Sequence, residues 1–423
     1  MSTTPTKIKG TNRTPGIILR ILLLVCSTVF STNLYSTSYQ SESIESIEEK
    51  EEYVGYLFVY FTGNQGSQEA IRFAVSEDGK KFTALNKNNP VLSSSAISES
   101  GGVRDPHIAR GADGIFYMVA TDMVSAKGWN SNRGMVLLKS PDLIHWSSVA
   151  INITKTYPLF FGNVIRVWAP ETIYDKTNGK YMIYFSMLRT GENFDKLYYV
   201  YANESFTGFE FSTTRFFQNP PQGMIDANIV EKDSIFHLFY KTEGSGNGIK
   251  KATSKNLAGT YTLFNTYLQP NTNPVEGECV FKSLNSEKWY MMYDVYTRGY
   301  YEFTESTDLK NFSVVHNFSL DFNPRHGTII PITREEITRL KTNSIVYTGI
   351  TTVRNEIELL SHDPSTQKVI SVNGFYISRG NYEKIDVIDI YGKKILTCEL
   401  KEGTNFIVVP SGIYIIKETK SFK

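Results

Sequence analysis

The stretch Val103-Arg104-Asp105-Pro106-His107-Ile108 decides the predicted fold, because it puts a carboxylate at the head of an apolar strand. The turn signal Gly101-Gly102 comes directly before it. Four later segments have the same form, a small or polar head followed by an apolar strand, at residues 168–173, 225–229, 275–280 and 325–329. We predict that these segments are the inner strands of five blades.

The chain from residue 53 onward repeats with a period of about 50 to 65 residues, which is in the range of propeller blades. In each repeat the head strand is followed by an aromatic-rich strand, a third strand and a polar turn that ends in an aromatic residue, as at residues 140–146. The predicted fold is therefore all-β, a five-bladed β-propeller over residues 53–340. A β-sandwich with irregular loops would explain the strands but not the aligned heads.

One of the five blades is split between the two ends of the propeller. Residues 56–62 and 70–75 supply a second and a third strand without a head strand, whereas residues 325–332 supply a head strand with no blade after it. We predict that these segments pair in one blade. The pairing closes the ring and leaves no long exposed sheet edge.

Composition narrows the class of protein. With 423 residues the chain has room for one large domain and a smaller one. Its 26 Tyr, 26 Phe and 4 Trp suit pleated sheets. The formal net charge is +1 and no basic block is present, so nothing predicts a nucleic-acid partner.

The N-terminus has the pattern of an export signal and cleavage region, over residues 1–38. Its apolar run, residues 21–30, is about half of the roughly 20 residues that span a bilayer, so we expect no permanent membrane span. Residues 39–52 are predicted to be a mobile charged spacer. Cys26 would suit a lipoprotein site, but Val25 stands where such sites want a small residue. We therefore expect a secreted or outer-surface protein.

The heads are important because inner strands of a propeller line its central channel, so their first residues face one cavity. Aligned on the strands that follow, Asp105, Asp226, Glu276 and His326 take equivalent places, with Ala169 as the uncharged member. Cleavage of a glycosidic bond needs two acids across a pocket, one protonated and one ionised. A third carboxylate beside the proton donor would keep it protonated.

Residues 53–340 resemble glycoside hydrolase family 43, the five-bladed arabinofuranosidases and xylosidases. The matching motifs are Arg104-Asp105-Pro106, Trp168-Ala169-Pro170-Glu171, Ile225-Asp226 and Glu276-Gly277. The resemblance implies that Asp105 is the general base, that Asp226 tunes the pKa of the proton donor and orients substrate, and that Glu276 is the general acid. It also implies inversion of the anomeric centre. One departure is Ala227, since family members often have proline after this acid.

Glu278 competes with Glu276 for the acid role, because residues two apart on a strand face the same way. Related propellers that cleave fructosides use an Arg-Asp-Pro motif and a Glu-Cys pair, and this chain has Glu278-Cys279. Those enzymes also need an upstream Asn-Asp-Pro motif, which is absent before Asp105. The alignment of the heads favours Glu276.

Other residues are candidates for binding the sugar. We expect the loops between second and third strands to wall the pocket, at residues 63–69, 122–133, 187–195, 243–247 and 295–298. Trp129 and Trp168 would stack on sugar rings, while Arg104, Arg325 and Asn247 would contact hydroxyl groups.

His326 is expected to have a role in the channel. By the resemblance it would help to hold a channel ion, often calcium, through water, although no cofactor is required.

Residues 341–423 begin no new blade, and the end of this region alternates as strands do. It resembles the C-terminal sorting domain of the type IX secretion system, a small β-sandwich, and the implied partner is the secretion machinery. An accessory sugar-binding sandwich is the alternative. Cys279 and Cys398 fall in different predicted domains, so a disulfide between them is not expected.

Two classes of function are compatible with these patterns. The first is an exo-acting glycosidase that removes a terminal sugar from an oligo- or polysaccharide, with α-L-arabinofuranose favoured and β-D-galactofuranosidase or β-xylosidase activity as competitors. The second is a propeller that binds glycan without cutting it. The binding module predicts loss of at least one acid from the heads, and none is lost.

Overall fold

The computed structural model describes residues 52–215, 222–244 and 246–350, together with six strands between residues 368 and 419. The predicted export signal and all but the last residue of the predicted spacer lie outside the described residues.

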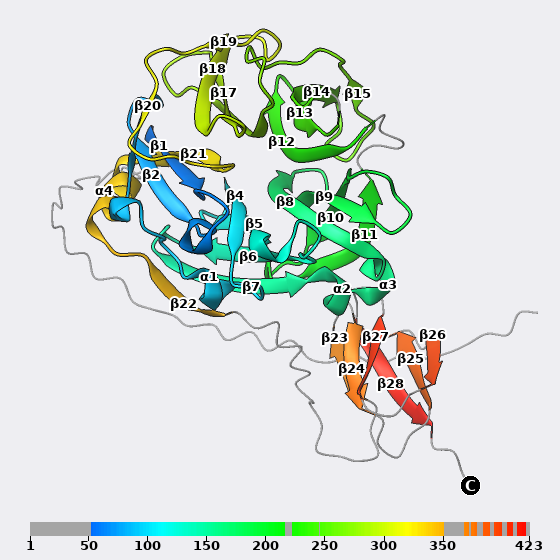
Figure 1. The fold of residues 1–423 in the computed structure, drawn as a ribbon. Coiled ribbons are helices and arrows are strands. Elements are labelled where there is room, and N and C mark those ends of the chain that lie inside the picture. The colour runs from blue at the N-terminus through cyan, green and yellow to red at the C-terminus, as the bar shows by residue number, and fades with distance from the viewer. Residues whose placement is uncertain are drawn as a thin grey trace, which may run out of the picture. The chain divides into compact units, whose positions relative to one another are not determined.

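Five antiparallel sheets follow one another in the chain as blades (Figure 1). Blade 1 contains β1 (Tyr53–Tyr60), β2 (Arg72–Ser76), β3 (Lys81–Ala84) and β21 (Thr328–Thr333). Blade 2 contains β4 (Val103–Arg110), β5 (Phe116–Asp122), β6 (Gly134–Ser140) and β7 (His145–Asn152). Blade 3 contains β8 (Val164–Asp175), β9 (Lys180–Arg189), β10 (Lys196–Ala202) and β11 (Phe209–Arg215).

Blade 4 contains β12 (Met224–Lys232), β13 (Ile235–Thr242), β14 (Ile249–Ser254) and β15 (Thr262–Leu263). Blade 5 contains β16 (Glu276–Lys282), β17 (Trp289–Val295), β18 (Tyr300–Ser306) and β19 (Ser313–Val314). Short helices lie in the connections: 3₁₀ turns Gly66–Gln68, Asn86–Asn88 and Ser125–Lys127, α1 (Ser94–Ile97), α2 (Ile153–Thr156) and α3 (Pro158–Phe161).

The split blade closes the ring as predicted. Strand β21 pairs antiparallel with β1, with Phe58 opposite Ile329. The inner strands β4, β8, β12, β16 and β21 contact one another in that order, and β21 contacts β4 again. The five-bladed propeller is therefore confirmed, and the β-sandwich alternative for this region is wrong.

The closing turns use one side-chain device in three blades. Asp78, Asp142 and Asp308 each accept hydrogen bonds from two backbone N–H groups that follow in the same turn. An aspartate that bonds its own backbone in this way stabilises a tight turn. Apolar residues on the faces of neighbouring blades then pack together, as Phe73 of β2 does against Trp146 of β7.

The chain after β21 continues to contact the propeller. Helix α4 (Arg334–Thr342) begins with a capping box, in which Thr333 and Glu336 bond each other's backbone N–H groups. Strand β22 (Val346–Ile350) then pairs in parallel with β7 at the edge of blade 2. The predicted boundary between residues 340 and 341 thus falls inside a helix, and one strand beyond it joins a blade. Strand β20 (Ser319–Leu320) covers the edge of β3 in the same way.

The C-terminal region contains strands, as predicted. A four-stranded sheet is formed by β23 (Lys368–Ser371), β28 (Ile413–Thr419), β25 (Lys384–Asp389) and β26 (Lys394–Glu399), and β24 (Gly374–Ser378) pairs with β27 (Thr404–Val408). Packing of the two sheets into a sandwich stays a prediction.

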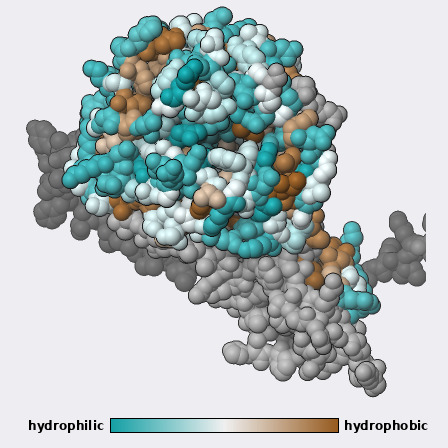
Figure 2. Space-filling model, viewed as in Figure 1, coloured by the Kyte–Doolittle hydropathy of each residue, from teal (hydrophilic) through white to brown (hydrophobic). Residues whose placement is uncertain are grey.

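The surface of the propeller mixes hydrophilic and hydrophobic side chains, with hydrophilic ones in the majority on the face drawn in Figure 2. Within the part of the chain that the structure describes, no helix combines the length and the apolar character needed to span a bilayer.

Candidate active site

The inner strands of four blades share one irregularity at their heads. In β4, β8, β12 and β16, two residues on the inner strand face one on the second strand, which is a β-bulge. The first residue of each bulge has positive φ: 48° at Asp105, 44° at Ala169, 52° at Asp226 and 63° at Gly277. For a residue other than glycine this conformation is uncommon and often marks a functional site. The bulge redirects the side chains of Asp105 and Asp226 relative to a regular strand.

The register corrects the predicted alignment of the heads. Gly277, not Glu276, occupies the place of Asp105 and Asp226, and Glu276 lies one residue earlier, level with Arg104. A Cβ atom at Gly277 would lie 2.6 Å from Cβ of His326, so this position cannot carry an acid without displacement of His326. The offset is already present in the sequence, since Asp105 and Asp226 lie three residues before Ile108 and Ile229, whereas Gly277 lies three residues before Val280.

Glu278 is not in the pocket. Its side chain is fully buried, and neither of its carboxylate oxygens has a hydrogen-bond partner among the described residues. Burial raises the pKa of Glu278 well above its usual value. Glu276 therefore faces the pocket and its rival does not.

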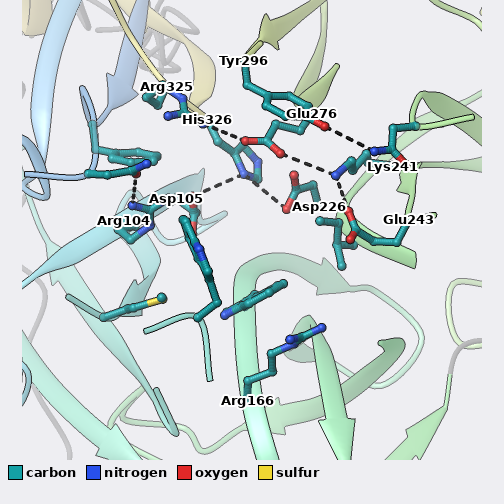
Figure 3. A pocket seen from close by; sticks show the side chains of 17 residues that line it. Arg104, Asp105, Arg166, Asp226, Lys241, Glu243, Glu276, Tyr296, Arg325 and His326 are labelled. Atoms are coloured by element: carbon teal, nitrogen blue, oxygen red, sulfur yellow. Dashed lines mark hydrogen bonds and ion pairs between the residues drawn. The ribbon is translucent and has the colours of Figure 1, made fainter. Parts of the chain in front are cut away.

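The heads surround a cavity of about 520 Å³ to which all five blades contribute. All nine predicted site residues line it: Arg104, Asp105, Trp129, Trp168, Asp226, Asn247, Glu276, Arg325 and His326. The predicted wall loops also contribute Asn64, Met123, Glu243 and Tyr296, and the lining that was not predicted comprises Phe61, Arg166, Ile225 and Lys241. Four of the five predicted wall loops take part, and the loop at residues 187–195 does not. Figure 3 shows Asp105, Asp226, Glu276 and His326 pointing toward one another.

Asp105 and Asp226 are held from different sides. Thr121 Oγ1 donates a 2.8 Å hydrogen bond to Asp105 Oδ2, and Gly277 N donates a 3.0 Å bond to Asp226 Oδ2. His326 Nδ1 lies between the two acids, 3.7 Å from Asp105 Oδ1 and 3.8 Å from Asp226 Oδ1. The imidazole nitrogen thus lies within ion-pair distance of both carboxyl groups without a hydrogen bond to either.

The surroundings of Asp226 shift its titration. Burial raises its pKa to about 6; the charge of His326 opposes this rise, while the charges of Glu276 and Asp105 add to it. Asp226 therefore exchanges a proton close to neutral pH, at the centre of the acid cluster.

Glu276 lies between two cations. Arg325 Nη2 is 2.7 Å from Glu276 Oε1, and Lys241 Nζ is 3.5 Å from Oε2. Arg325 also pairs with Asp294, and Lys241 also pairs with Glu243. Burial raises the pKa of Asp294 to about 6, opposed by Arg325. Carboxyl groups thus outnumber cations around Glu276. Asp226 and Asp294, each with a pKa of about 6, exchange protons close to neutral pH.

Aromatic and cationic side chains form the opposite wall. Trp129 and Trp168 meet edge to face with ring centroids 6.2 Å apart, and Trp129 is 52% exposed. Arg104 lies over the rings of Phe61 and Trp129 at 4.6 and 5.4 Å, and Arg166 lies over Trp168 at 4.1 Å. Such rings can stack on a sugar. Arg104 is also tied to Asn64 and Glu69 by hydrogen bonds, so its guanidinium is fixed.

Several missed residues belong to one column of the repeat. On the second strand of each blade, the residue opposite the first residue of the head is Phe61, Thr121, Ser186, Lys241 or Asp294. Thr121, Lys241 and Asp294 each contact a head residue or its partner. The same repeat that located the heads could have located this column. Arg166 carries no comparable signal, since it precedes its head by two residues.

One layer deeper, the inner strands present a second ring of side chains: His107, Glu171, Asn228, Cys279 and Thr328. These residues bond across to neighbouring inner strands. His107 Nδ1 accepts from Thr172 N at 3.2 Å, and Asn228 Oδ1 accepts from Val280 N at 3.0 Å. We call this set the ring layer. We call Asp105, Asp226, Glu276 and His326 the pocket layer.

The described residues do not form a direct metal site. No group of three or more His, Cys, Asp or Glu side chains among them is arranged to hold an ion. Calcium prefers six to eight oxygen ligands, and His326 Nδ1 faces two carboxyl groups instead. The predicted ion held through water stays a prediction, and no step proposed below depends on it.

Comparisons with known proteins identify the family of the chain. A family-43-related model described as a probable glycosyl hydrolase domain matches residues 51–338. An α-L-arabinofuranosidase of Bifidobacterium longum subsp. longum is 26% identical over 215 residues, which are 45% of this chain and 20% of that protein. The chain thus spans about a fifth of the length of this curated relative.

Solved structures are similar at low identity. A xylan β-1,4-xylosidase from Bacillus halodurans is 14% identical with a TM-score of 0.47, over 65% of this chain and 55% of that one. A Bacillus subtilis arabinanase is 19% identical with a TM-score of 0.37, over 57% and 82% of the two chains. The match to the family model covers most of the chain. The chain therefore belongs to the family described as a probable glycosyl hydrolase domain, which is related to family 43.

Proposed function

We propose that the chain is an inverting, exo-acting glycoside hydrolase that removes terminal furanose residues, α-L-arabinofuranose first among them, from polysaccharide. The observation that carries the proposal is the convergence of Asp105, Asp226 and Glu276 from three blades on one pocket with an aromatic wall. Loops from four blades surround the pocket, which suits the end of a glycan better than its middle.

The proposed roles follow from the contacts. Asp105, fixed by Thr121, is the general base that removes a proton from the attacking water. Glu276, on the far side of His326, donates a proton to the leaving oxygen. Asp226, bonded to the backbone of Gly277, keeps negative charge beside the donor and orients the sugar. No covalent intermediate forms, because water attacks the anomeric carbon directly.

Substrate contacts come from both walls. Trp129 and Trp168 present aromatic surface for a sugar face, whereas Arg104, Asn247 and Arg325 present polar groups for hydroxyls. A furanose and a pentopyranose differ little in the groups that they offer. A β-D-galactofuranosidase or a β-xylosidase activity is therefore a competing outcome of the same test.

The test is a screen of the purified protein against 4-nitrophenyl α-L-arabinofuranoside, β-D-galactofuranoside and β-D-xyloside. The highest kcat/KM on the arabinofuranoside would support the proposal. The highest kcat/KM on the galactofuranoside or the xyloside would show that the preferred sugar is a different one. Inversion is read separately by NMR of the first product. We expect inversion because Asp105 and Glu276 come from blades that are not neighbours, so their carboxyl groups should face each other across the pocket. Inverting enzymes hold these two groups about 6.5–9.5 Å apart, whereas retaining enzymes hold them about 5–5.5 Å apart. A first product of retained configuration would contradict the mechanism.

We also propose that the protein is exported and sorted to the exterior through its C-terminal region. The support is the basic and apolar pattern of residues 1–38 and the strands after residue 368. Truncation after residue 350 should leave the protein inside the cell envelope. Release into the medium without the C-terminal region would contradict the sorting role.

A further inference from the structure

Lys241 and Glu243 form an ion pair at the pocket wall beside the proposed proton donor. Lys241 comes from β13, its side chain is 4% exposed, and it belongs to the column of second-strand residues that face the heads. Glu243 comes two residues later, where the loop begins, and its side chain is 35% exposed. Figure 3 shows the ammonium group of Lys241 between the carboxyl groups of Glu276 and Glu243.

The two oxygens of Glu276 are in different situations. Oε1 takes a 2.7 Å hydrogen bond from Arg325, which occupies it. Oε2 is 3.5 Å from Lys241 Nζ, beyond the usual length of a charge-assisted hydrogen bond. Lys241 instead donates a hydrogen bond to Glu243. Oε2 is thus the oxygen that has room for a proton.

We infer that the Lys241–Glu243 pair positions the proton of Glu276: Glu243 holds the ammonium group away from Oε2, and so lets Glu276 keep the proton that it donates to the leaving group. This inference rests on the proposed function. Lys241 and Glu243 are positioning residues here, because they act on the reaction through Glu276.

The other charges around Glu276 do not remove the effect. Arg325 is shared with Asp294, and His326 faces Asp105 and Asp226. The charge of Lys241 also lowers the pKa of Asp226. The ring of Tyr296 lies 5.4 Å from Lys241 Nζ. Lys241 and Glu243 are therefore the pair whose balance can be changed without altering the groups that hold Asp105.

Two substitutions should move the pH–rate profile in opposite directions. Lys241→Met removes a cation from the donor, so Glu276 should keep its proton to higher pH and the basic limb should rise by about one pH unit. Glu243→Gln frees Lys241 to approach Oε2, so the basic limb should fall by about one pH unit. A merely structural role of the pair would not give shifts of opposite sign.

Leaving groups give a second readout. At a fixed pH above the wild-type basic limb, Glu243→Gln should lose roughly tenfold in kcat/KM on a xylosyl- or arabinosyl-oligosaccharide and little on a 2,4-dinitrophenyl glycoside, which needs little protonation. Lys251→Met is the matched control, since Lys251 is a buried lysine of the same blade that bonds Leu309 O away from the pocket.

The inference would be overturned if the basic limbs of Lys241→Met and Glu243→Gln moved in the same direction or did not move. Equal losses of kcat/KM by Glu243→Gln on the oligosaccharide and the 2,4-dinitrophenyl glycoside would also overturn it. If the wild-type protein cleaved no glycoside at all, the proposed function itself would fail. If wild type is active and Glu276→Ala is not, the proposed function holds, and the pH profiles then test the inference on Lys241 and Glu243 alone.

Discussion

The pocket layer and the ring layer come from the same inner strands, only two or three residues apart, yet they are built for opposite purposes. In the pocket layer, Asp105 and Asp226 sit on bulges with positive φ, and His326 Nδ1 lacks a hydrogen-bond partner among the described residues. In the ring layer, Glu171 receives hydrogen bonds from Tyr184 and Asn228. The proposed chemistry thus lies in the layer whose polar groups are incompletely satisfied, and contacts that close the propeller lie in the layer whose groups are paired.

Titration separates the layers in the same way. Burial lowers the pKa of His107 to about 3 and raises that of Glu171 to about 8, so both ring residues are mostly uncharged at neutral pH. Asp226 in the pocket layer, with a pKa of about 6, is mostly ionised there. Charge is therefore kept at Asp226 in the pocket layer and removed at His107 and Glu171 in the ring layer.

The largest expected effect breaks the pocket layer. Asp105→Ala should lower kcat about 10⁴-fold on every glycoside, including aryl glycosides with good leaving groups, because no base remains to activate water. The measurement is kcat on a series of aryl glycosides. Glu171→Gln in the ring layer is the matched control and should keep most of the activity. Restoration of Asp105→Ala by azide with a retained-face adduct would assign Asp105 a different role.

The next effect separates acid from base within the pocket layer. Glu276→Ala should lose roughly 10³-fold on a polysaccharide and much less on a 2,4-dinitrophenyl glycoside, since such a leaving group departs without a proton. The ratio of the two losses is the measurement. A Glu278→Gln variant tests the rival acid, and selective loss there instead would transfer the role to Glu278.

The sequence was a good guide to the heads for a physical reason. A propeller must place each inner strand around one axis, so a repeat in the chain becomes a ring in space, and Asp105, Asp226, Glu276 and His326 all line one cavity. The split blade followed from the same rule, because an open sheet edge is unfavourable.

Some of what was missed was readable in the sequence. The one-residue offset of Glu276 could have been counted there, since Gly277 and not Glu276 lies three residues before Val280. Lys241 was not among the predicted site residues, although its column in the repeat was readable. Helix α4 was also readable, since Thr333 and Glu336 have the spacing of a capping box. The pairing of β22 with β7 has no local signal.

The ring layer predicts a pH dependence of stability. The folded-state pKa of Glu171, about 8, lies above the ordinary value for a glutamate. Its contribution to the free energy of unfolding is therefore fully present below about pH 4.3 and is lost as the pH rises through 8. Each pKa unit corresponds to about 1.4 kcal/mol, so the loss is on the order of a few kcal/mol.

Glu171→Gln, which cannot ionise, should flatten this part of the profile. Urea unfolding at pH 5, 7 and 9 measures it as the difference between wild type and variant. The variant should gain stability relative to wild type as the pH rises. A difference that stays constant across the three pH values would mean that Glu171 does not titrate in this range.

The smallest expected effect lies in the pocket layer and concerns Asp226. Ionised above about pH 6, Asp226 places a negative charge beside the proton donor, and like charges favour the protonated form of a neighbouring carboxyl. Asp226→Asn removes this charge but keeps an oxygen that can accept the bond from Gly277 N. The basic limb of kcat/KM should therefore move down by about one pH unit. The acidic limb, which reports ionisation of Asp105, should move less. A basic limb that stays in place, with kcat reduced at every pH, would mean that Asp226 orients the sugar and does not tune the donor.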